Sequence, residues 1–153
     1  MNGKWVAAAI LGPALLAGAA VWWLQVYAYY ERVEPVGPHE MTLVTTEGAP
    51  VPLRVEDWEG IDASSSPQRF RACFRTHLPQ DQGFQPYPGA EPLNAPGWFD
   101  CFDARQIGEA LERGEARAYL SARNVHVDVD RVIAIFPDGR AYAWQQFNPA
   151  AKE

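Results

Sequence analysis

The sequence predicts an α+β protein with one N-terminal transmembrane helix and a small exported domain of antiparallel hairpins, one short helix and one disulfide. Three observations predict this fold. Residues 5–30 contain no charged side chain and no histidine, whereas all 19 acidic residues follow position 30. The chain has two cysteines, Cys73 and Cys101. After residue 40, segments in which apolar and polar residues alternate are separated by turns that contain glycine or proline. This pattern is typical of hairpins.

The apolar segment 5–30 is predicted to cross a membrane as a single helix. At about 1.5 Å per residue it spans roughly 39 Å, more than a hydrocarbon core of about 30 Å. Aromatic rings gather at both of its ends, and such rings favour the headgroup level of a bilayer. The predicted interface residues are Trp5, Trp22, Trp23, Tyr27, Tyr29 and Tyr30.

The charges that flank this segment predict its orientation. Lys4 and the terminal amine precede it, and the positive-inside rule then leaves residues 1–4 in the cytoplasm. Residues 31–40 form a linker and residues 41–153 a periplasmic domain, so we expect a single-pass protein of the bacterial inner membrane. The alternative is a cleaved signal peptide ending at the small residues 17–19. We favour an uncleaved signal anchor because the apolar run continues for another ten residues.

Small residues recur at a spacing of four within the helix. Ala8 with Gly12 and Ala14 with Gly18 would allow a second membrane helix to approach closely. The alternative is that alanine and glycine are simply common in such helices. We predict that these four residues pack against a partner helix.

The charge balance of the exported part restricts which classes of molecule it is expected to bind. Residues 31–153 carry 12 basic and 19 acidic residues, a net charge of −7. This balance argues against nucleic acid as a partner and is compatible with a basic protein partner. Ordinary solubility explains the same balance. Beyond the lipid bilayer itself, the expected partner is an integral membrane protein complex.

The two cysteines are predicted to form a disulfide. An even number of cysteines in an exported domain favours a bridge, and closing this loop would stabilise the fold by roughly 3–4 kcal/mol. A metal or redox site with two thiolates is the alternative, but C-x-x-C spacing is absent.

Local patterns predict the elements of the domain. Residues 41–46 and 51–56 form a hairpin, and residues 69–76 form a strand that carries Cys73. Asp103 followed by Gln106 resembles a capping box, and Gly114 ends that helix. Residues 115–120 are ambiguous between helix and strand. Residues 131–136 and 141–147 form the clearest hairpin, around the turn at 137–140.

A long irregular loop is the candidate interaction surface. Residues 79–97 contain five prolines and three glycines, and long loops in compact domains are either functional or tolerated. We predict that Phe84, Tyr87 and the nearby Trp98 contact a partner. For Trp98 the alternative, a hydrophobic cluster around the disulfide, is the favoured interpretation.

The candidate metal ligands are His126, Asp128 and Asp130. Their spacing of two places them on one face of a predicted strand. Because valines alternate with them, an ordinary solvent-facing strand explains the same pattern, and we favour that explanation. The other histidines, His39 and His77, are expected at the surface. No nucleophile, phosphate-loop or covalent-haem motif is present, so we predict no cofactor and no catalytic residue, although enzymatic activity is not excluded.

Four long stretches of the chain are similar to an uncharacterised family, a domain of unknown function, of single-pass inner-membrane proteins from alphaproteobacteria. These stretches are residues 24–31, 59–74, 95–104 and 130–144. The resemblance implies a bacterial inner-membrane setting and a domain built around Cys73 and Cys101. It implies no activity, cofactor or catalytic residue.

Two functions follow as hypotheses. The first is an accessory subunit or assembly factor of an inner-membrane complex, such as a respiratory or photosynthetic electron-transfer complex. The second is a membrane-tethered periplasmic protein that binds a metal or another ligand.

Overall fold

The computed structural model describes residues 2–35, 40–79 and 82–152. The chain divides into two compact units, Met1–Tyr30 and Glu31–Glu153. We describe each unit by itself.

The first unit is the expected apolar helix. Helix α1 (Gly3–Trp23) begins after Asn2, whose side chain accepts a hydrogen bond from the Lys4 N–H, and continues as the π-helix η1 (Leu24–Ala28). The continuous helix Gly3–Ala28 has 26 residues and is long and apolar enough to cross a membrane. None of its residues is buried. This confirms an N-terminal helix suited to serve as a membrane anchor or a signal sequence.

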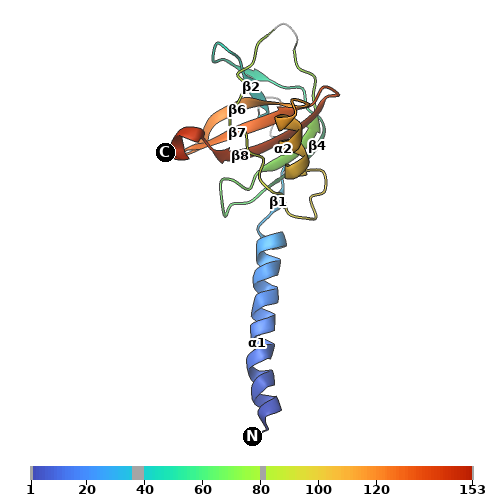
Figure 1. The fold of residues 1–153 in the computed structure, drawn as a ribbon, viewed down its shortest axis with the longest axis vertical. Helices are drawn as coiled ribbons and strands as arrows, with labels where there is room; N and C mark the ends of the chain where they lie inside the picture. The colour runs from blue at the N-terminus through green and yellow to red at the C-terminus, as the bar shows by residue number, and fades with distance from the viewer. Residues whose placement is uncertain (1, 36–39, 80–81, 153) are drawn as a thin grey trace. The chain divides into compact units, whose positions relative to one another are not determined.

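The second unit is built on one large antiparallel sheet (Figure 1). Its strands, in spatial order, are β1 (Glu31–Arg32), β4 (Glu56–Asp62), β5 (Arg71–Arg75), β8 (Arg140–Phe147), β7 (Val129–Ile135) and β6 (Arg117–His126). A small second sheet pairs β2 (Thr42–Val44) with β3 (Pro50–Pro52). Helix α2 (Ala104–Glu112) lies in front of the large sheet in Figure 1, and the 3₁₀-helix η2 (Pro149–Lys152) follows β8.

One face of the large sheet carries the main hydrophobic core. Because side chains alternate across a strand, Ala72 and Phe74 of β5 share this face with Ala143 of β8 and Ile133 of β7. The β2–β3 hairpin covers the face with apolar side chains of its own. The buried residues of this cover are Met41, Leu43 and Leu53. The domain is therefore an α+β fold, as the sequence predicts.

The opposite face carries the layer that contains α2. Here Tyr142 and Trp144 of β8 meet the ring of Phe102, at centroid distances of 6.1 and 6.4 Å. Cys73 points to the same face and is joined to Cys101, two residues before the N-cap Asp103. The sheet therefore lies between a hairpin on one face and a helix with its preceding loop on the other.

The observed strands depart from expectation in three places. The hairpin predicted at 41–56 is shorter than expected, because its second strand β3 ends at Pro52. A separate strand, β4, begins at Glu56. Of the segment 115–120, left ambiguous, residues 117–120 open the long strand β6. The predicted linker begins inside the sheet, because Glu31 pairs with Asp62. The linker residues 36–39, which include His39, lie outside the described residues.

Candidate functional site: the groove beside helix α2

An apolar groove of about 1090 Å³ lies between α2, the start of β6 and the proline-rich loop. Its apolar lining residues on α2 and β6 are buried or half-buried, among them Leu111, Ala116 and Tyr119. Its charged lining residues are all exposed. These residues are Glu91, Arg105, Glu109, Glu112 and Arg117. The groove thus has an apolar floor and a charged rim.

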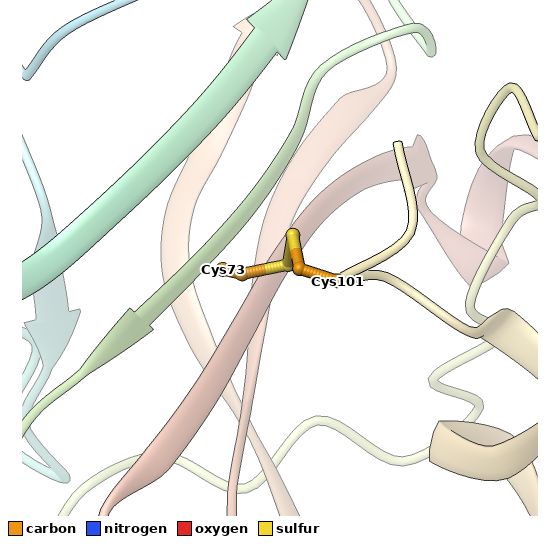
Figure 2. The surroundings of a disulfide bond; sticks show 2 residues. All are labelled: Cys73 and Cys101. Carbon is orange, nitrogen blue, oxygen red and sulfur yellow. A yellow bond between two sulfur atoms is a disulfide. The ribbon is translucent and has the colours of Figure 1, made fainter. Parts of the chain in front are cut away.

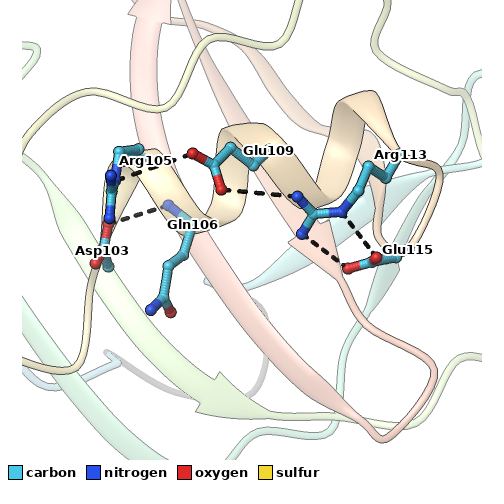
Figure 3. Close-up of polar contacts among 6 residues, drawn as sticks. All are labelled: Asp103, Arg105, Gln106, Glu109, Arg113 and Glu115. Carbon is cyan, nitrogen blue, oxygen red and sulfur yellow. Dashed lines mark hydrogen bonds and ion pairs between the residues drawn. The ribbon is translucent and has the colours of Figure 1, made fainter.

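Helix α2 forms one wall, and its local sequence explains how it is held. Asp103 is the N-cap and accepts a hydrogen bond from the Gln106 N–H at 3.0 Å (Figure 3). Ile107 and Ala110 are buried against the domain. On the exposed side, ion pairs join Arg105 to Glu109, Glu109 to Arg113 and Arg113 to Glu115, as Figure 3 shows.

The groove is hollow because α2 carries small residues on the flank that lines it. Ala104 and Gly108 are one turn apart and both line the groove. A methyl group added at Gly108 would have no atom within 4 Å. The space therefore follows from the sequence of α2, where a larger side chain at position 108 would enter the groove.

The proline-rich loop forms the other wall and is fixed by backbone hydrogen bonds. The Gln85 N–H donates to the Val44 carbonyl at 2.8 Å, and the Leu120 N–H donates to the Gln85 carbonyl at 3.0 Å. The Tyr87 N–H donates to the Ala118 carbonyl at 2.9 Å. Residues 84–87 therefore join the edge of the small sheet to the edge strand of the large one.

A buried pair of side chains, one from the loop and one from β7, holds the same loop against the large sheet. The Tyr87 hydroxyl donates to the Asp130 carboxylate at 3.0 Å, and both side chains are buried. That carboxylate also accepts from the Asn124 N–H at 3.0 Å and lies 3.8 Å from the Arg123 guanidinium. Burial and the neighbouring carboxylate raise the pKa of the Tyr87 hydroxyl far above its ordinary value, so it remains a donor.

The disulfide and a buried arginine hold the rest of the loop. Cys73 of β5 and Cys101 are bonded across 28 positions of sequence (Figure 2), which confirms the predicted bridge. Beside Cys73, the buried Arg71 donates to the carbonyls of Leu93 and Asn94, at 2.8 and 3.0 Å. The loop between Leu93 and Cys101 is thus tied to two positions of β5, Arg71 and Cys73, that lie on the same face of the strand.

Residues 40–153 match the model of a family of unknown function, DUF6446. The chain belongs to this family. No curated protein and no solved structure matches the chain. The family match confirms the predicted membership of an uncharacterised family, and it covers the whole groove while leaving out the apolar helix.

Within the DUF6446 domain, the predicted interaction residues lie differently from expectation. Phe84 and Tyr87 are only 8% and 7% exposed, yet both line the groove, so their contact with a partner stays a prediction. They are buried because hydrogen bonds draw their segment onto β2 and β6. Trp98 is half-buried and contacts Phe99 edge-on at 6.3 Å. The loop lines the groove through Phe84 and Tyr87 together with its prolines.

The predicted metal ligands of the DUF6446 domain do not share a strand face. His126 ends β6, Asp128 has a φ of 61° in the turn that follows, and Asp130 is buried in β7. The prediction of one strand was wrong because a hairpin turn falls inside the His-x-Asp-x-Asp series. Among the described residues, no group of three or more His, Cys, Asp or Glu side chains has a geometry that could hold a metal ion.

A smaller pocket of about 440 Å³ with several polar lining residues lies at another place in the domain. Glu31, Asp62 and His126 line it, together with Ser64 and Ser66. Burial raises the pKa of the Asp62 carboxyl, against the opposing influence of the Ala63 N–H and of Arg131. The carboxylate form of Asp62 is thus less favourable here than in water.

The predicted membrane residues all lie on the apolar helix or directly after it. Trp23 stacks on Tyr27 with ring centroids 4.7 Å apart, and Trp22 meets the same ring edge-on. Methyl groups added at Gly12 or Gly18 would have no atom within 4 Å. The small-residue pairs, which also include Ala8 and Ala14, remain a predicted packing surface. Their exposure is compatible with a partner helix.

Sequence reasoning named Phe84 and Tyr87, which line the groove, but it missed the α2 residues that form the other wall. Ala104 and Gly108 have the same small-xxx-small spacing that was noticed in the apolar helix. That spacing, on the flank of an amphipathic helix, is the available signal. The role of Arg71 had no local signal, because its partners Leu93 and Asn94 follow more than 20 positions later.

Proposed function

We propose that the protein is a membrane-anchored periplasmic interaction protein, an accessory subunit or assembly factor of a bacterial inner-membrane complex. The apolar helix Gly3–Ala28 is the observation that carries this proposal. Its side chains are unburied over a length that exceeds a hydrocarbon core. Such a surface is stable only in a bilayer or against other apolar helices.

The proposed orientation rests on two further features. Lys4 precedes the helix, which favours a cytoplasmic N-terminus. Disulfides persist in oxidising compartments such as the bacterial periplasm, so the Cys73–Cys101 bond supports an exported domain. A cleaved signal sequence is the alternative use of the same helix. The anchor is favoured because aromatic residues at the far end, Trp22 to Tyr30, match an interface belt.

The interaction role rests on the groove. A floor of apolar residues surrounded by exposed charges resembles the anatomy of a protein interface. The proposed host is an inner-membrane assembly such as a respiratory or photosynthetic electron-transfer complex, because the anchor places the domain beside such complexes.

Co-purification tests the interaction role. The full chain, tagged at its C-terminus and extracted from bacterial membranes with mild detergent, is expected to migrate as part of a larger complex on size exclusion. Mass spectrometry should then find integral membrane proteins in near-stoichiometric amount. A chain recovered alone in two different mild detergents would refute the proposal.

Reporter fusions test the orientation separately. Alkaline phosphatase fused after residue 153 is expected to be active, because it folds in the periplasm. A fluorescent reporter that folds only in the cytoplasm should be dark at the same position. The opposite pattern would overturn the proposed orientation. Release of a shortened soluble chain would favour the signal sequence.

A second candidate function is a membrane-tethered protein that binds a small apolar ligand. The groove volume, about 1090 Å³, is near the upper end of the range of ligand sites. Native mass spectrometry of the purified full chain distinguishes this function from the interaction role. A bound small molecule would appear as a discrete added mass that denaturation removes.

A further inference from the structure

Building on the proposed function, we propose that the groove beside α2 binds an apolar segment of a partner polypeptide that carries basic residues next to its apolar anchors. The surface consists of the α2 flank with Ala104 and Gly108, the start of β6 and the proline-rich loop. The argument rests on the shape, the chemistry and the charge of this surface.

The chemistry of the lining favours an apolar occupant. A site for a polar small molecule contains a few convergent polar groups that fix its orientation. The buried polar side-chain atoms that lack a partner among the described residues belong to Thr76, Ser121 and Arg131. None of these residues lines the groove. Directional recognition is therefore weak at the floor, and contact between apolar surfaces remains as the source of affinity.

The rim distinguishes a polypeptide from a purely apolar ligand. Protein interfaces combine an apolar centre with a polar, solvent-accessible rim. Here charges of both signs surround the floor, and Glu112 and Arg117 take part in none of the ion pairs found among the described residues. A polypeptide can present apolar side chains to the floor and charged side chains to these two groups.

The overall charge indicates the sign of the flanking residues. Residues 31–153 have a net charge of −7, whereas the rim itself is nearly balanced, with three carboxylates and two guanidinium groups, so the sign comes from the domain as a whole. Opposite charge on a partner accelerates encounter and discourages acidic competitors. The partner segment is therefore expected to be basic around its apolar anchors.

The walls are already in place before any partner binds. Proline fixes its own φ and donates no backbone hydrogen bond, and Pro86, Pro88 and Pro92 line the loop side. Hydrogen bonds from Gln85 and Tyr87 hold that loop to two sheets. Little ordering entropy is then lost on binding. Helix α2 has nine residues, so the wall is about 13 Å long, enough for about two turns of a partner helix.

Site-specific photo-crosslinking tests the location and the chemistry of the occupant. A photoreactive amino acid replaces Gly108 in the full chain, and cells producing it are irradiated before their membranes are isolated. The control places the same amino acid at Gln106, which is on α2 but outside the groove lining. We expect a polypeptide adduct from position 108 only. Its sequenced peptide should be apolar with Lys or Arg within about one turn.

Several outcomes of this experiment would overturn the proposal. These are a lipid or small-molecule adduct at position 108, an adduct on an acidic segment, and equal labelling at positions 106 and 108. An absence of adducts at both positions, while co-purification recovers a partner, would also overturn it.

A blocking variant tests whether the groove carries the interaction. Gly108→Trp fills the groove and is expected to lower partner recovery at least tenfold. Gly108→Ala and Gln106→Trp are the matched controls and should retain recovery within about twofold. Circular dichroism and an intact disulfide verify folding of each variant. If Gly108→Trp keeps its partner, the groove proposal fails while the proposed function stands. If the wild-type chain has no partner, the proposed function itself fails.

Discussion

At the scale of single residues, buried polar pairs decide how the groove wall is held. The Tyr87 hydroxyl reaches the Asp130 carboxylate across 43 positions of sequence. Asp130 is only 1% exposed, so its carboxylate depends on every donor it contacts. Tyr87 is therefore a structural residue of the loop, although its aromatic ring suggested an exposed contact residue.

Removing that hydroxyl is expected to destabilise the domain. Tyr87→Phe leaves a buried carboxylate with one donor fewer, and hydrogen bonds to charged groups contribute about 1.5–3 kcal/mol. We expect the free energy of unfolding of the full chain in detergent to fall by about that amount, measured by chemical denaturation. Tyr119→Phe is the control, because Tyr119 contacts Phe84 through its ring. Equal effects of both substitutions would contradict this role of the hydroxyl.

A second residue, Asp62, gives a pH-dependent prediction. Burial raises its folded pKa above the unfolded value near 3.8. Its contribution to stability is therefore largest below that value and is lost as the pH rises through the folded pKa. Asp62→Asn should unfold at higher denaturant than wild type at pH 7, and this difference should shrink towards pH 3. A difference that grows as the pH falls would contradict the prediction.

At the scale of elements, α2 shows how local sequence determines a short helix. Nine residues are too few for a stable isolated helix, so the N-cap and the packing against the domain decide whether this helix forms. Asp103 satisfies the Gln106 N–H, and Ile107 and Ala110 anchor the helix to the domain. These features were predictable because all of them lie within one or two helical turns.

The N-cap of α2 is open to a direct test. Asp103→Ala removes the acceptor of the Gln106 N–H, and losing such a cap typically lowers stability by about 1 kcal/mol. We expect a corresponding fall in the free energy of unfolding of the full chain. Asp103→Asn keeps an acceptor oxygen and should stay within a few tenths of a kcal/mol of wild type. If both variants lose the same amount, the charge rather than the cap is responsible.

Strand β4 shows where local sequence misleads. Residues 56–62 contain four acidic residues and a glycine, a composition that disfavours strands. The strand forms because β5 supplies a pairing partner and because its own Trp58 packs against Phe70 and Phe74. The indole N–H donates to the Val33 carbonyl at 2.6 Å, and its ring lies so close to Gly60 that no Cβ would fit there.

At the scale of the whole domain, the disulfide joins two layers. It ties the segment before α2 to the central strand β5, so it supports the groove wall as well as the fold.

Reducing or removing this bond is expected to lower stability substantially. The bridge closes a loop across 28 positions, for which chain entropy predicts about 3–4 kcal/mol. We expect the double variant Cys73→Ser, Cys101→Ser to lose about that free energy of unfolding. Reductant should produce the same loss in wild type and no further loss in the double variant. An unchanged unfolding midpoint in reductant would contradict the prediction.

The sequence by itself determined the features that depend on neighbours along the chain. These are the apolar helix, the cap of α2, the hairpin of β7 and β8, and the even pair of cysteines. Only the tertiary structure decided which distant segments meet: the loop at residues 84–87 on β6, Arg71 on Leu93, and Asp130 beneath Tyr87. The physical reason is that local propensities act over a few residues, whereas a groove is formed by packing and loop closure between segments whose separation carries no local signal.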